Sequence, residues 1–170
     1  MGLREQVRDV VSNSDDGALE ALVADQPRAV RHLLGLSYRA DPALRRAAAR
    51  GIALAARHHP ELVASVVRRL IWAMNDESGT NALCAPEVLL AIADERPALL
   101  LPMVPELMRL GADPGLRDGL AQTLRAITAS CPGEVGKRVA DDLAHPEQRR
   151  ARDRERLERY RREKKITESP

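Results

Sequence analysis

Four prolines recur along the chain at nearly equal intervals, and their spacing limits what the chain can fold into. Pro27, Pro60, Pro97 and Pro132 are separated by 33, 37 and 35 residues, and each lies between two apolar segments. A repeat of this length is typical of stacked pairs of helices, because one pair alone cannot bury its apolar face. Proline suits the first turn of a helix and is costly in the middle, so we expect each proline to begin the second helix of a pair.

The apolar periodicity predicts where these helices lie. In residues 62–74, apolar side chains recur with the spacing of one buried helical stripe: Val63, Val66, Val67, Leu70, Ile71 and Met74. The segment before it carries smaller residues at the same spacing, such as Ala48 and Gly51, which let two helices approach closely. Asp41-Pro42 and Asp113-Pro114 each offer an N-cap residue followed by proline at the first helical position.

We therefore predict an all-α fold without a β-sheet. The pattern predicts a capping helix at 3–12 and four pairs of helices: 16–25 with 28–38, 42–58 with 61–74, 85–95 with 98–110, and 114–130 with 134–144. The chain has one Trp, two Tyr and no Phe, a composition that suits closely packed helices better than a β-sandwich. We expect a helical-repeat domain at 1–145 and a charged, partly solvated helical tail at 146–170.

The layout of residues 16–144 resembles the HEAT-like helical repeats. The resemblance rests on alanine-rich helices and on two helix starts, Asp-Pro-Ala-Leu-Arg at 41–45 and Asp-Pro-Gly-Leu-Arg at 113–117. Residues 72–79, followed by Ala85-Pro86-Glu87, are similar to a segment of small HEAT-like proteins of anaerobic bacteria, a group without a firmly assigned activity. The resemblance implies a right-handed α-α solenoid of about four helix pairs, with an N-terminal capping helix and a charged C-terminal helix. It implies no particular chemistry.

A polar segment between residues 75 and 84 interrupts the repeat and gives a candidate surface for a partner. This surface also includes the end of the preceding helix, and its residues are Arg68, Arg69, Trp72, Asn75, Asp76, Glu77, Ser78 and Asn81. Interrupting loops in repeat proteins often gather on a binding face, although a purely structural turn is the alternative. Trp72 lies off the apolar stripe, either as an anchor for a partner or as a support beneath the loop. The oxygen-rich side chains would suit calcium, but their spacing does not match the twelve-residue calcium loop.

The sequence predicts no catalytic residue, no cofactor and no metal site. It lacks the phosphate-binding, zinc-protease and serine-hydrolase motifs. His58 and His59 lie at a predicted helix C-terminus, where a histidine interacts favourably with the helix dipole. Cys84 and Cys131 form no CxxC pair, so the sequence indicates neither a disulfide framework nor a zinc site.

The charges suggest an alternative function. The tail from residue 146 holds ten Lys or Arg against six Asp or Glu, and Arg46, Arg50 and Arg57 form a stripe on one predicted helix. Because such side chains neutralise phosphates, a nucleic-acid-binding protein that uses the stripe and the tail is one alternative. The interspersed acids and the shortage of aromatic side chains weaken it. An enzyme or cofactor-handling protein that uses the 75–84 loop is another alternative.

The leading prediction is a non-enzymatic scaffold or adaptor that contacts another protein. Helical repeats expose extended surfaces for this purpose, and no cluster of reactive side chains stands out in the sequence. The chain shows no N-terminal leader, and no apolar run approaches the roughly 18 residues that span a bilayer. We therefore expect a cytoplasmic bacterial protein without a membrane partner.

Overall fold

A computed structural model describes residues 2–13, 15–75 and 84–144, together with Ala151, Arg154, Glu155 and Glu158. Within these residues the chain is helical and contains no β-strand, so the predicted all-α class is confirmed for the described part of the chain. In chain order, the elements are α1 (Leu3–Asn13), α2 (Asp16–Asp25), α3 (Ala29–Leu36), α4 (Pro42–His58), α5 (Pro60–Asn75), α6 (Ala85–Glu95), the 3₁₀ turns η2 (Pro97–Leu99) and η3 (Leu101–Met103), α7 (Val104–Leu110), α8 (Arg117–Ser130) and α9 (Pro132–Ala144). None of the described helices is long and apolar enough to span a bilayer. The predicted boundary between residues 145 and 146 lies outside the described residues.

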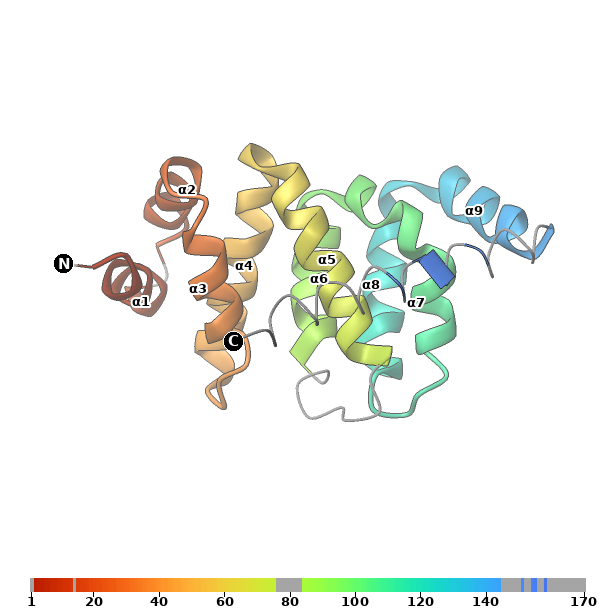
Figure 1. Cartoon of the computed structure of the whole chain (residues 1–170), viewed down its shortest axis with the longest axis horizontal. Helices are drawn as coiled ribbons and strands as arrows, with labels where there is room; N and C mark the ends of the chain where they lie inside the picture. The colour runs from red at the N-terminus through yellow and green to blue at the C-terminus, as the bar shows by residue number, and fades with distance from the viewer. Residues whose placement is uncertain are drawn as a thin grey trace.

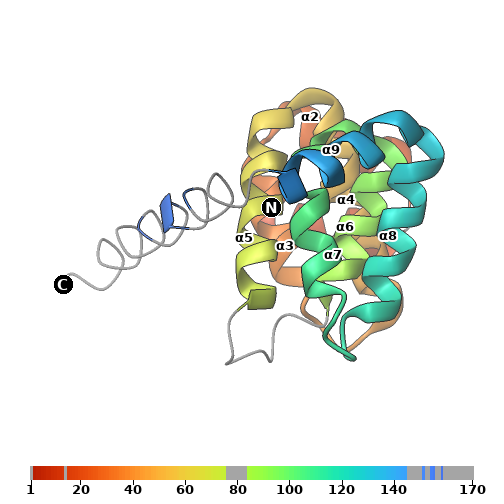
Figure 2. The same ribbon diagram turned by 90° about the vertical axis from the view of Figure 1, so that its right-hand side faces the viewer.

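The helices form two layers. In the first layer, α2, α4, α6 and α8 lie side by side in chain order, and each contacts the next (Figure 1). The second layer consists of α3, α5 and α7, which lie together on one side of the first layer (Figure 2). At the N-terminal end, α1 packs against α2, α3 and α4, as expected of a capping helix, while α9 packs against α7 and α8 at the other end.

The four prolines divide into two groups. Pro60 and Pro132 begin α5 and α9, as predicted. Pro97 begins only the 3₁₀ turn η2, and Pro27 lies in a turn two residues before α3. The predicted helix at 98–110 is therefore wrong in its first half. Pro102 and Pro105 follow within eight residues of Pro97, and each removes a backbone donor that a continuous α-helix would use, so 3₁₀ turns replace it.

The two Asp-Pro segments also behave differently. Asp41 caps α4, because its side chain accepts hydrogen bonds from the amides of Ala43 at 2.9 Å and Leu44 at 3.4 Å. Asp113 instead accepts from the amide of Gly115 at 2.7 Å within a turn, and α8 begins only at Arg117. The predicted start at 114 is thus three residues early. Glycine has a poor helix propensity and favours turns, whereas the alanine at position 43 favours the helix.

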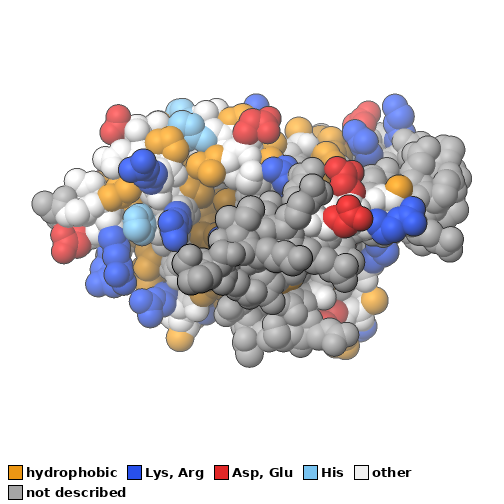
Figure 3. Space-filling model, in the orientation of Figure 1, with side chains coloured by type: hydrophobic (Ala, Val, Ile, Leu, Met, Phe, Trp, Pro, Cys, Tyr) orange, Lys and Arg blue, Asp and Glu red, His pale blue; other side chains and the backbone are white. Residues whose placement is uncertain are grey.

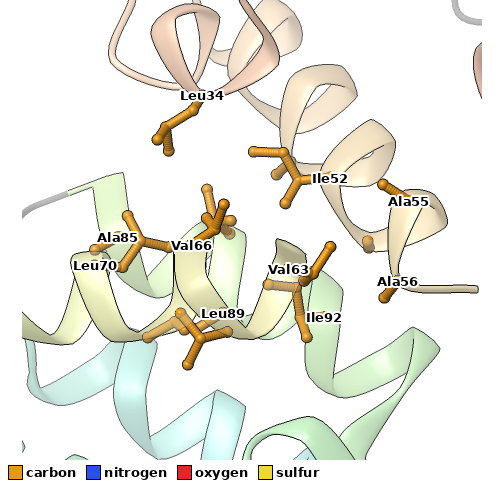
Figure 4. Packing of buried hydrophobic residues seen from close by; sticks show 14 of the residues in the cluster. Leu34, Ile52, Ala55, Ala56, Val63, Val66, Leu70, Ala85, Leu89 and Ile92 are labelled. Atoms are coloured by element: carbon orange, nitrogen blue, oxygen red, sulfur yellow. The ribbon is translucent and has the colours of Figure 1, made fainter. Parts of the chain in front are cut away.

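The core lies between the two layers. All six residues of the predicted α5 stripe are buried, from 0% exposure at Val63 and Leu70 to 8% at Val66. The central helix α4 contacts α2, α3, α5 and α6, and it is buried on more than the single face that the sequence predicts. Figure 4 shows Ile52 of α4 packed among side chains of α3, α5 and α6. A Cβ added at Gly51 would lie 2.9 Å from Leu33 Cδ1, so the small residue is needed for this close approach.

Candidate functional site

Three neighbouring helices of the first layer form an open groove of about 550 Å³, the α4–α6–α8 groove. Its floor is apolar, with Ala49, Pro86, Leu90 and Ala91 among the lining residues. Gly119 of α8 also lines the groove, and a Cβ there would lie only 2.5 Å from Pro86 Cβ. Glycine at this position therefore lets α8 approach α6 closely.

Two of the four charged side chains that line the groove are already paired. Glu87 accepts from Arg45 Nε at 3.1 Å, and Arg50 pairs with carboxylates of α2 and α6. Arg46 and Asp94 also line the groove and are exposed, but neither forms an ion pair within the described residues. The groove therefore offers one unpaired cation from α4 and one unpaired anion from α6 beside an apolar floor.

The remaining arginines of the predicted stripe belong to a network that joins α2, α4 and α6. Arg50 binds Asp16 Oδ2 at 3.0 Å through Nε and Glu95 Oε2 at 2.6 Å through Nη1. Arg57 binds Glu20 Oε2 at 3.0 Å through Nη1, and its Nε also donates to Glu95. The expected stripe of Arg46, Arg50 and Arg57 is thus divided. Arg50 and Arg57 hold neighbouring helices together, and only Arg46 is left for an external anion.

The network changes the ionisation of its carboxyl groups. Hydrogen bonds from His58 and Arg57 lower the pKa of Glu20 from its ordinary value. At Glu95, whose side chain is 11% exposed, burial alone would raise the pKa. The hydrogen bonds from Arg57 and Arg50 outweigh burial, so the pKa of Glu95 is also lowered. Both carboxylates are therefore stabilised in their charged form by the folded arrangement.

This electrostatic arrangement predicts a pH dependence of stability. A carboxyl group whose pKa is lowered by folding adds stability above its unfolded pKa, about 4.3 for Glu, and loses it as the pH falls through the lower folded value. In Glu95→Gln, the free energy of unfolding should therefore be lower at pH 7 and should fall less steeply below pH about 4.5 than in the wild type. Urea unfolding at several pH values measures both quantities. Asp94→Asn controls for the loss of one negative charge, and equal pH slopes for Glu95→Gln and the wild type would contradict the prediction.

The predicted partner surface at the end of α5 is only partly described. Asp76, Glu77, Ser78 and Asn81 lie outside the described residues. Asn75 donates to the backbone oxygen of Ile71 at 2.9 Å and to Glu106 Oε1 of α7 at 3.4 Å. The part of the predicted surface that contains Asn75 is therefore directed toward α7.

The other three residues of that surface point in different directions. Arg68 is exposed and donates to Ser65 Oγ at 2.8 Å, while Trp72 is half-buried. Burial raises the pKa of the Tyr38 hydroxyl, and the positive charge of Arg69 partly opposes that rise. Arg69 thus lies close to the segment that follows α3. Arg68 therefore contacts its own helix, whereas Arg69 lies near Tyr38.

Cysteine, histidine and carboxylate side chains give no second candidate. Cys84 and Cys131 are both unpaired and half-buried. Within the described residues, no group of three or more His, Cys, Asp or Glu is placed to hold a metal ion. His59 Nε2 lies 3.1 Å from the carbonyl oxygen of Ala24, a contact between α2 and the end of α4. Within the described part of the chain, the candidate functional sites are therefore surfaces and not clusters of reactive side chains.

Comparisons with known proteins add no relative. No family model matches the chain, and neither a curated protein nor a solved structure matches it.

Proposed function

We propose that this chain is a HEAT-like helical-repeat protein that binds another protein and catalyses no reaction. Its repeats would be the pairs α2–α3, α4–α5, α6–α7 and α8–α9 in a right-handed α-α solenoid, with α1 as the cap and a charged helix in the C-terminal tail. Support for the repeats comes from the regular order of the first layer and from prolines that follow its helices at similar intervals.

The α4–α6–α8 groove carries this proposal. Helical-repeat proteins bind their partners on surfaces formed by equivalent helices of successive repeats, and in the proposed repeats α4, α6 and α8 would be the equivalent first helices that line the groove. The apolar floor can cover apolar side chains of a partner, while Arg46 and Asp94 can orient it through complementary charges. The groove is open, whereas small-molecule sites usually enclose most of the ligand surface, so a protein segment fits it better.

The test is affinity capture with a matched pair of charge-swap variants. Arg46→Glu with Asp94→Arg reverses both unpaired charges of the groove and leaves the net charge unchanged. Arg125→Glu with Asp9→Arg makes the same two changes at exposed positions outside the groove. A partner should be enriched from bacterial lysate by the wild type and the control, and at least about tenfold less by the groove variant, a difference of about 1.4 kcal/mol.

Binding measured with the purified partner should then show the same difference between the groove variant and the other two proteins. Isothermal titration calorimetry should give the same loss for the groove variant, while all three proteins should melt at similar temperatures because the altered side chains are exposed. Equal binding by the groove variant and the wild type would contradict the proposal.

A further inference from the structure

The boundary between α3 and α5 is a second surface with its own chemistry. Figure 4 shows Leu34 of α3 directed toward Val66 of α5. These side chains are 6% and 8% exposed, whereas most of the core is below 3%. The apolar core therefore comes close to solvent along this boundary, the α3–α5 seam, which comprises Arg31, Leu34, Tyr38, Leu62, Val66 and Arg69.

The helical spacing places the other residues of the seam beside Leu34 and Val66. Arg31 precedes Leu34 by three positions in α3, and Tyr38 lies in the turn that directly follows this helix. On α5, Leu62 and Arg69 stand four positions before and three after Val66, which puts them on the same flank of that helix. The effect of the Arg69 charge on the pKa of Tyr38 agrees with this placement. Asn75, on the opposite flank of α5, contacts Glu106 of α7.

The seam is basic, and the described part of the chain provides no carboxylate that pairs with its arginines. Arg31 and Arg69 are exposed, and no carboxylate within the described residues pairs with either, in contrast to Arg45, Arg50 and Arg57. Leu62 is 36% exposed at the same surface. Figure 3 shows arginine side chains (blue) over α1 and α3, with hydrophobic side chains beside them. Arginines beside an apolar strip, of which Leu62 is the exposed part, are complementary to a ligand that is both acidic and apolar.

We propose that the α3–α5 seam binds an acidic amphipathic helix of a partner protein. The apolar side of that helix would cover Leu34, Leu62 and Val66, and its carboxylates would pair with Arg31 and Arg69. The apolar strip favours a protein segment over nucleic acid, because a phosphate backbone gains nothing from aliphatic side chains and Tyr38 is the one aromatic ring of the seam. This proposal does not depend on the α4–α6–α8 groove, which lies in the other layer.

The probe is a fluorescein-labelled peptide of about 18 residues with leucine on one helical face and glutamate on the other, about 27 Å long as a helix. A second peptide replaces its leucines by serine, and duplex DNA serves as a third probe. Fluorescence anisotropy with the full chain should show that the Leu/Glu peptide binds at least about tenfold more tightly than either of the others. Equal binding of the two peptides, tighter binding of the DNA, or no binding of the Leu/Glu peptide would each overturn the proposal.

Matched variants locate the binding. Arg31→Glu with Arg69→Glu should weaken binding of the Leu/Glu peptide at least about tenfold, because like charges would then face each other. Arg117→Glu with Arg125→Glu on α8 changes the net charge equally and should leave the affinity within about twofold. Equal weakening by both pairs would show nonspecific attraction and overturn the proposal.

Arg31→Gln with Arg69→Gln provides a milder pair should the glutamates disturb folding. The groove variant Arg46→Glu with Asp94→Arg should bind the peptide normally, so failure of one proposal can be told from failure of the other.

Discussion

Leu70→Asp is expected to abolish cooperative folding of this chain. Leu70 is fully buried on α5, on the side that faces Ala85 of α6 (Figure 4). An aspartate there would leave an unpaired charge in the core, at a cost of several kcal/mol against a typical total stability of about 5–15 kcal/mol. A thermal melt followed by circular dichroism should show no cooperative transition. Ser65→Asp introduces the same charge on the exposed side of α5 and should melt close to the wild type, so similar melts for the two variants would show that the register of α5 is wrong.

Gly119→Leu should produce the second largest loss, by forcing α8 away from α6. The first atom of the new side chain would already lie 2.5 Å from Pro86 Cβ, and the proline ring is fixed to the backbone and cannot rotate away. Overpacking of this kind typically costs about 1–3 kcal/mol, and leucine adds three more carbons. Urea unfolding measures the loss of free energy.

Gly136→Leu is the matched control. Apart from the neighbouring backbone of α9, no atom of the described residues lies within 4 Å of the Cβ position of Gly136, and leucine has the better helix propensity. This variant should be as stable as the wild type or slightly more stable. Equal destabilisation at both glycines would mean that the close contact between α6 and α8 is absent.

The helices could be predicted from the sequence where a single signal, such as a capping residue or an apolar stripe, determines the local structure. The bounds of α2, α4 and α6 agree with the prediction, and the buried stripe of α5 was recognisable from its spacing. The prediction failed where two signals in the sequence favour different local structures. Three prolines within nine residues broke the helix before α7, and Gly115 turned the capping signal of Asp113 into a turn.

The surfaces were harder to predict, because they depend on helices that are distant in sequence. Arg50 and Arg57 looked like a free basic stripe, but their carboxylate partners lie 34 to 45 residues away along the chain. The groove likewise joins α4, α6 and α8, and it includes the close approach of Gly119 to Pro86. Arg68 and Arg69 are adjacent in sequence, but successive helical residues point about 100° apart, so Arg68 contacts Ser65 of its own helix whereas Arg69 lies near Tyr38.

Photo-cross-linking from the groove tests the central claim most directly. Benzoylphenylalanine at Gln122, an exposed residue lining the α4–α6–α8 groove, should form a cross-link with the partner that the wild type captures. The same amino acid at Glu134, an exposed position on α9 outside the groove, should form none. If the chain binds its partner through the groove, the cross-link from position 122 should also disappear in the Arg46→Glu, Asp94→Arg background. A partner that cross-links from position 134 and not from position 122 would contradict the account.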